Sequence, residues 1–121
     1  MSYKIFHNSR CKHSRAGLDY LKKLTSEFEV REYLSDAITP KEMKEIVMKL
    51  NLKPSQIVRT NEEYYKTYLK GKTFNDDEWI RILLENPKLI QRPIVVGKYK
   101  AVIGNPPEEI DKLFKKVNES K

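Results

Sequence analysis

The sequence predicts an α/β protein with a mixed four-stranded sheet and a block of helices inserted in the middle of the chain. Residues 3–34 show the pattern of a strand, a helix and a second strand. Residues 93–104 show the pattern of a β-hairpin, and a further helical pattern follows it. The stretch between them is patterned as broken helices. We therefore expect a single domain over 1–121, with a helical insertion at about 37–90.

The first strand and helix are joined by a short polar loop. In "YKIFHN" the side chains alternate between two faces, as in a strand of mixed character. From Ser14 onward the pattern changes, and leucines recur at helical spacing at positions 18, 21 and 24. Cys11 therefore lies in a loop between the end of a strand and the N-terminus of a helix.

The second strand is predicted in "FEVREYL" at residues 28–34, and a helix should begin soon after it. Thr39 is a suitable N-cap, Pro40 suits the first helical position, and Glu42 completes a capping box. The apolar positions that follow lie on one helical face, namely Met43, Ile46, Val47 and Leu50.

Residues 51–90 are predicted to be helical and interrupted. "NEEYYKTYLKG" ends at Gly71, a suitable C-cap, and we expect its helix to pack through its aromatic face. That face comprises Tyr64, Tyr65, Tyr68 and Leu69. In "NDDEWIRILLENP" a second helix should begin with Asn75 as N-cap and Glu78 three residues on, and end before Pro87.

The last third returns to β structure. "PIVVGKYKAVIG" contains two β-branched runs around Gly97 and Lys98, which is typical of a hairpin. "PPEEIDKLFKKV" then places apolar residues on one helical face, at Ile110, Leu113, Phe114 and Val117. A βαβ unit followed by a hairpin and a terminal helix is the thioredoxin-like arrangement, and its connections satisfy the usual handedness rules.

Composition excludes several classes of protein. The net charge is +7, but the basic residues are mixed with 17 acidic ones around helix faces, so we expect no direct nucleic-acid binding. Two histidines and one cysteine do not make a metal site at any standard spacing. We find neither a membrane-spanning apolar run nor a secretion signal, and expect no membrane association and a cytoplasmic location. A single cysteine also fits a reducing compartment.

Cys11 is the candidate nucleophile. It stands in "HNSRCKHSR", where Arg10, Lys12 and Arg15 supply positive charge and no acid is present. A helix N-terminus and nearby cations both lower the pKa of a thiol and attract anions. His7 and His13 are further candidates for hydrogen bonds or charge. Since the chain holds no second cysteine, a redox cycle needs a thiol from another molecule.

A structural cysteine is the competing interpretation, because free cysteine is among the most buried residue types. A core cysteine should have apolar neighbours at the local period, whereas Cys11 has polar neighbours on both sides. Ser14 occupies the place of the second cysteine in a C-x-x-C motif. We expect its hydroxyl both to cap the helix and to donate a hydrogen bond to the thiolate.

Three segments resemble the glutaredoxin-coupled arsenate reductase (ArsC) family, within the thioredoxin-like superfamily that also contains Spx-type regulators. "FHNSRCKHSR" is similar to that family's H-N-x-x-C-x-x-S-R loop, and "LIQRPIVV" to its L-I-x-R-P-I-V-V segment. "IVRTNEEYYK" matches the stretch that carries a further arginine. The likeness runs in the same order from about residue 3 to 117.

The resemblance implies a role for each matching residue. Cys11 is implied as the catalytic nucleophile, and Arg59 and Arg92 as the arginines that hold the oxyanion. Pro93 matches a cis-proline beside the active thiol. The residues implied to shape the loop and promote ionisation of the thiol are His7, Asn8, Ser14 and Arg15.

Two departures bear on the substrate. Asn105 in "VIGNPPEEI" stands where the reductases carry another anion-binding arginine, and Ser9 replaces a frequent proline. Loss of one arginine removes a charge-assisted contact worth about 1.5–3 kcal/mol. The ending also resembles Spx-type transcription regulators, although these usually carry C-x-x-C and a longer C-terminal region.

The leading hypothesis is a thiol-dependent reductase in which Cys11 attacks an oxyanion such as arsenate. No bound cofactor is expected; glutathione, a glutaredoxin or another small thiol completes the cycle. One alternative is an Spx-like regulator that binds RNA polymerase. Another is a glutaredoxin-like reductase of mixed disulfides. The sequence leaves open the physiological substrate, the electron donor, the oligomeric state and the effect of Asn105.

Overall fold

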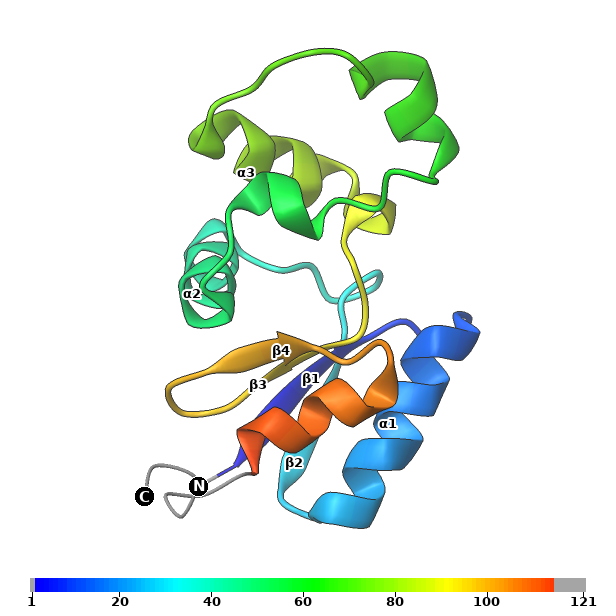
Figure 1. The fold of residues 1–121 in the computed structure, drawn as a ribbon, viewed down its shortest axis with the longest axis vertical. Coiled ribbons are helices and arrows are strands. Elements are labelled where there is room, and N and C mark those ends of the chain that lie inside the picture. The colour runs from blue at the N-terminus through cyan, green and yellow to red at the C-terminus, as the bar shows by residue number, and fades with distance from the viewer. Residues whose placement is uncertain (1, 115–121) are drawn as a thin grey trace. The chain divides into compact units, whose positions relative to one another are not determined.

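The computed structural model describes residues 2–114 and contains one four-stranded sheet. The strands are β1 (Tyr3–His7), β2 (Phe28–Glu32), β3 (Ile94–Val96) and β4 (Ala101–Ile103), in the spatial order β2-β1-β3-β4 (Figure 1). β1 pairs with β2 in parallel, and the other neighbours are antiparallel. The predicted α/β class with a mixed four-stranded sheet is confirmed.

The chain divides into two compact units. The first, called here the sheet unit, comprises Met1–Glu32 and Arg92–Lys121, and the second, the inserted unit, comprises Tyr33–Gln91. The inserted unit thus begins directly where β2 ends. No helix within residues 2–114 combines the length and the apolar character needed to cross a membrane.

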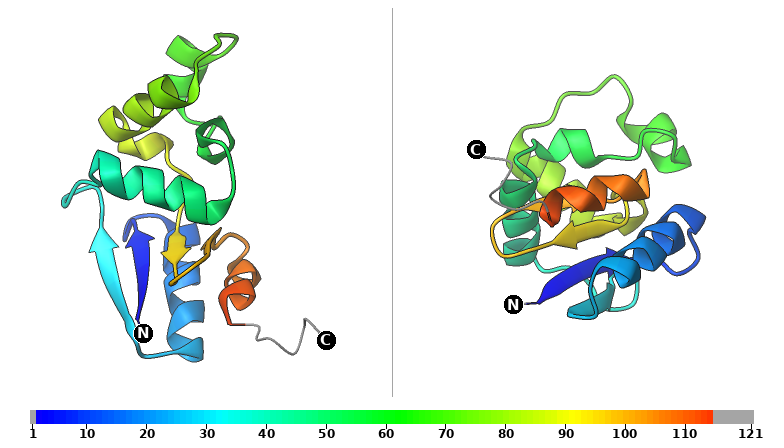
Figure 2. Two further views of the ribbon diagram at one scale, coloured as in Figure 1. Left: turned by 90° about the vertical axis from the view of Figure 1, so that its left-hand side faces the viewer. Right: turned by 60° about the horizontal axis from the view of Figure 1, so that its bottom comes forward.

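The core of the sheet unit lies between the sheet and two helices. The α-helix α1 (Lys12–Leu24) and the 3-10 helix η4 (Pro107–Leu113) pack against each other, and Figure 2 shows both beside the strands. Each of the five central core residues comes from a different element: Ile5, Leu21, Val95, Val102 and Ile110. This packing fixes the start of α1 relative to the end of β1, where the Cys11 loop lies.

Two boundaries in this unit differ from the prediction. α1 begins at Lys12 rather than at Ser14, and its N-cap is Cys11. The terminal helical segment is a 3-10 helix that ends at Leu113, whereas an α-helical face through Val117 was expected; position 117 lies outside the described residues. Ile110 is buried as predicted, and Leu113 and Phe114 pack against the core.

The inserted unit consists of helical segments, as predicted. They are α2 (Pro40–Leu50), η1 (Pro54–Ile57), the π-helical turn η2 (Tyr65–Leu69), α3 (Asp76–Glu85) and η3 (Pro87–Leu89). Both predicted capping boxes are present: Thr39 with Glu42 at the start of α2, and Asn75 with Glu78 at the start of α3.

The tyrosine-rich stretch does not pack as predicted. Tyr64 and Tyr68 are 42% and 56% exposed, and their rings lie against each other with centroids 4.9 Å apart. Of the expected aromatic face only Leu69 is buried. The reason is local geometry, because a five-residue π-helical turn replaces the longer α-helix that would have gathered these side chains on one face.

Candidate active site

Cys11 occupies the N-cap position of α1. Its backbone is extended (φ −98°, ψ 125°), and the Arg15 N–H donates to its carbonyl oxygen at 3.0 Å, which begins the helix. The Cys11 N–H in turn donates to the Asn8 carbonyl oxygen at 3.0 Å. The loop between β1 and α1 is therefore a tight turn that presents the sulfur at the positive end of the helix.

The surroundings of the sulfur favour the thiolate. Burial on its own raises the pKa of Cys11, but the Ser14 main-chain N–H, the Arg92 guanidinium and the His13 main-chain N–H all stabilise the anion. The pKa of Cys11 is lowered as a result. The thiol makes no side-chain cap hydrogen bond in the structure, and the main-chain N–H groups of Ser14 and His13 lower the pKa of Cys11 by hydrogen bonding to the thiolate.

The cation that acts on Cys11 comes from a distant part of the sequence. Arg92 precedes β3 and is only 8% exposed, and it lowers the pKa of Cys11 through both a hydrogen bond and its charge. The sequence suggested instead the neighbouring residues Arg10, Lys12 and Arg15, all three of which are exposed. A buried guanidinium is screened less by water than an exposed one, which explains the difference.

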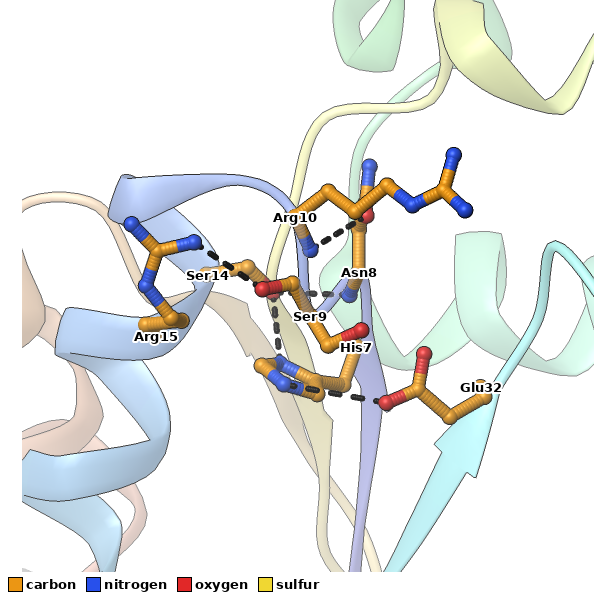
Figure 3. A network of polar contacts seen from close by, with 7 residues as sticks. All are labelled: His7, Asn8, Ser9, Arg10, Ser14, Arg15 and Glu32. Carbon is orange, nitrogen blue, oxygen red and sulfur yellow. Dashed lines mark hydrogen bonds and ion pairs between the residues drawn. The ribbon is translucent and has the colours of Figure 1, made fainter.

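Ser14 differs most from its predicted role. It is not the N-cap of α1 but the third residue of the helix, and its side chain is fully buried. Its hydroxyl lies 2.8 Å from His7 Nδ1 and accepts the Asn8 N–H at 3.0 Å (Figure 3). The expected hydroxyl contact with the thiolate is therefore replaced by a main-chain contact from the same residue.

His7 ends β1 and is buried beneath the loop. Figure 3 shows its ring between Ser14 and Glu32, with Nε2 3.9 Å from Glu32 Oε2. Burial lowers the pKa of His7 despite the opposing effect of Glu32, which favours the neutral imidazole. The contact with Glu32 is an ion pair only when His7 is protonated.

The remaining loop residues hold the turn. Asn8 Oδ1 accepts the Arg10 N–H at 3.0 Å, and Arg15 Nη1 donates to the Ser9 carbonyl oxygen at 2.9 Å. Arg15 thus binds the loop rather than pointing at the sulfur. These contacts connect both ends of the loop that carries Cys11.

Pro93 lies against the first half of α1. The Arg92–Pro93 peptide bond is cis, and the Pro93 carbonyl oxygen accepts the Gly104 N–H at 2.8 Å. A Cβ on Gly17 would collide with Pro93 Cγ, so only glycine lets this loop approach the helix so closely. Through Gly17, α1 supports the segment that carries Arg92.

Arg59 belongs to the inserted unit. Its Nη1 pairs with Glu62 Oε2 at 2.9 Å, and its N–H donates to the Leu89 carbonyl oxygen. The structure brings together the other predicted site residues within the sheet unit, namely His7, Asn8, Cys11, Ser14, Arg15, Arg92 and Pro93. The oxyanion-binding role of Arg59 stays a prediction. Among residues 2–114 no cluster of three or more histidine, cysteine or acidic residues is placed to hold a metal ion.

Sequence reasoning missed two residues of this site. Glu32 was not singled out, although it ends β2 as His7 ends β1, and the two are direct partners in the parallel register. The adjacent carboxyl ends of two parallel strands were the available signal. Gly17 could not be identified from the sequence, because the residue that packs against a helical glycine is known only from the three-dimensional structure.

Comparison with known proteins identifies relatives over almost the whole chain. A model of the ArsC family matches residues 6–113. The uncharacterized protein YfgD of Escherichia coli is 36% identical over 109 residues, which are 88% of this chain and 92% of the relative. Arsenate reductase of Neisseria meningitidis is 36% identical over 113 residues, 92% of this chain and 97% of the relative. The solved structure of arsenate reductase from Vibrio cholerae superimposes with a TM-score of 0.86 at 35% identity, covering 93% of this chain and 97% of that one.

Proposed function

The chain belongs to the ArsC family, and from this premise we propose that it is a thiol-dependent oxidoreductase of the arsenate reductase type, with Cys11 as its nucleophile. The observation that carries the proposal is the environment of the sulfur. Cys11 stands at an otherwise uncapped helix N-terminus, with a buried arginine beside it. Such a site activates a thiol and attracts an oxyanion by the same positive potential.

The proposed reaction has two stages. In the first, the Cys11 thiolate attacks the central atom of a tetrahedral oxyanion such as arsenate, forms a sulfur–arsenic bond and releases water after proton transfer. In the second, an external thiol forms a disulfide with Cys11, and the electron pair of the broken sulfur–arsenic bond stays on arsenic, which is reduced from As(V) to As(III). A second external thiol then releases Cys11.

Arg92 is proposed as the oxyanion ligand from the sheet unit. Its guanidinium already acts on the Cys11 sulfur, and a guanidinium presents paired donors to a tetrahedral anion. Arg59 is proposed as the second cationic ligand on the strength of the matching segment "IVRTNEEYYK". Glutathione or a glutaredoxin is proposed as the reductant, because the chain supplies no second cysteine.

The test is arsenate turnover by the purified protein. Arsenite formation should be measured with glutathione alone and with glutathione plus glutaredoxin, for the wild type and for Cys11→Ser. We expect turnover by the wild type with at least one reductant and none by the variant. Turnover that survives in Cys11→Ser would rule out this mechanism. Failure with arsenate combined with reduction of a glutathionylated peptide would move the substrate class to mixed disulfides.

A further inference from the structure

The contacts beneath the Cys11 loop form a chain of donors and acceptors that ends at Glu32. The Asn8 N–H donates to Ser14 Oγ, Ser14 Oγ lies 2.8 Å from His7 Nδ1, and His7 Nε2 lies 3.9 Å from a Glu32 oxygen (Figure 3). Four segments are connected in this way: the loop, the first turn of α1, and the ends of β1 and β2. The direction of the hydrogen bond between Ser14 and His7 depends on the tautomer of His7.

The electrostatics of the site favour one tautomer of His7 over the other. A neutral imidazole carries one N–H, on either Nδ1 or Nε2. With the proton on Nδ1, the ring donates to Ser14, and the Nε2 lone pair faces the Glu32 carboxylate, which is unfavourable. With the proton on Nε2, the N–H faces the carboxylate and Nδ1 accepts the Ser14 hydroxyl. Ser14 then accepts from Asn8 and donates to His7 without conflict.

We propose that Glu32 is a positioning residue that holds His7 as its Nε2–H tautomer. His7 Nδ1 then accepts a hydrogen bond from the Ser14 hydroxyl. Ser14 is thereby fixed in the first turn of α1, with its main-chain N–H directed at the Cys11 sulfur. The inference rests on the proposed function in one respect, since Cys11 must be the reactive group for the position of Ser14 to matter. In this proposal Glu32 acts on Cys11 through His7 and Ser14.

Protonation of His7 reverses the hydrogen bond. Imidazolium carries protons on both nitrogens, so Nδ1 becomes a donor and Ser14 loses its acceptor. The reactivity of Cys11 should therefore report the titration of His7. The charged groups that act on His7 come from β2 and α1: Glu32 and Asp19 favour protonation, whereas Arg15 and Lys22 oppose it.

The experiment reads the tautomer directly from the nitrogen chemical shifts of the imidazole rings in ¹⁵N-labelled protein. The chain has only two histidines, and His13 is exposed, so it serves as an internal reference. Glu32→Gln removes the charge and keeps the side-chain size. Glu29→Gln is the matched control, because Glu29 is an exposed glutamate on the same strand whose side chain points to the opposite face.

In the wild type we expect the Nε2–H tautomer of His7. In Glu32→Gln the ratio of the two tautomers should shift toward Nδ1–H, because the charge that favours an N–H on Nε2 is lost, and the pKa of His7 should fall. Glu29→Gln should change neither. The profile of Cys11 alkylation against pH should carry a second inflection that moves to lower pH only in Glu32→Gln.

An Nδ1–H tautomer in the wild type, or an unchanged tautomer ratio in folded Glu32→Gln, would overturn the proposal and leave Glu32 as a surface charge. The tautomer is readable whether or not the protein reduces an oxyanion. Failure of this inference and failure of the proposed function are therefore separate results.

Discussion

The three α-helices described within residues 2–114 begin in two different ways. In the inserted unit, α2 and α3 each begin with a complete capping box and have acidic residues in the first turn. In the sheet unit, α1 has Cys11 as its N-cap, with no side-chain cap hydrogen bond and no acid in its first turn. A capping box satisfies two of the N–H groups at a helix start, whereas an uncapped helix keeps them available for another acceptor.

This difference singles out the start of α1 as the candidate reactive site without reference to any relative. α2 and α3 use their N-termini for their own stability. At α1 the N-cap position is occupied by Cys11, and the main-chain N–H groups of His13 and Ser14 stabilise the Cys11 thiolate. A helix start with a net positive character is suited to a thiolate and to an incoming anion.

The largest effect is expected from Cys11→Ser, which gives α1 a conventional cap. Turnover should be lost completely, because serine is a far weaker nucleophile, while the free energy of unfolding at pH 7 should stay at or above that of the wild type. Chemical denaturation and arsenite formation measure the two quantities. A large loss of stability would show that Cys11 is chiefly a packing residue.

The difference in the free energy of unfolding between the wild type and Cys11→Ser should change with pH. Folding lowers the pKa of Cys11, so the thiolate stabilises the folded wild type fully above the unfolded pKa of about 8.5. That contribution is lost as the pH falls through the folded pKa. Denaturation series on both proteins should show the wild type gaining relative to Cys11→Ser as the pH rises through this window, and parallel curves would argue against a perturbed thiol.

Replacing Arg92 should give the next largest effect. Arg92→Met removes a buried cation, so the pKa of Cys11 should rise and kcat/KM for arsenate should fall by about 10- to 100-fold, the value of one charge-assisted contact. Alkylation kinetics and turnover provide the measurements. The comparison variant is Arg10→Met, which removes an exposed cation adjacent to Cys11 in sequence. Equal effects from both would mean that sequence neighbours, not Arg92, set the potential at the sulfur.

Asn105→Arg should strengthen binding of the oxyanion at the proposed site. Asn105 follows Gly104, whose N–H binds the Pro93 carbonyl oxygen, and the resemblance to the arsenate reductases implies an arginine at this position. A cation there should raise kcat/KM for arsenate by about tenfold. Asn105→Lys separates charge from guanidinium geometry. A gain in neither variant would indicate that the wild-type site already binds its oxyanion fully.

The smallest effect is expected from Asn75→Ala, which breaks the capping box of α3. The free energy of unfolding should fall by about 1 kcal/mol, since one N-cap side chain is lost. The pKa of Cys11 should not change, because the capped helices have no part in activating the thiol. A change in thiol reactivity would contradict the contrast between the helix N-termini of the two units.

Local patterns made much of the fold predictable. The capping boxes at Thr39 and Asn75, the β-branched runs around Gly97 and the alternation in "YKIFHN" each depend on a few neighbouring residues. Tyr64 and Tyr68 were predicted wrongly because helical spacing alone does not reveal that the helix is reduced to a π-helical turn. Side chains gather on one face of a helix only where the backbone keeps the same helical period over enough residues.

The site was predictable in part for the same reason. Cys11 could be singled out because its polar neighbours lie beside it in the chain. The hydroxyl of Ser14 could not be assigned, because its partner His7 lies on another element and competes with the thiol for the same proton. Glu32 and Gly17 join the site only through strand register and helix packing.

The most direct test of the central claim is the rate of Cys11 alkylation against pH, measured with and without arsenate. The account predicts a thiol pKa below about 8.5 together with protection by the anion, because one helix N-terminus and one buried arginine serve both. An unperturbed pKa without protection would contradict it, and would make Cys11 a structural residue at an ordinary helix start.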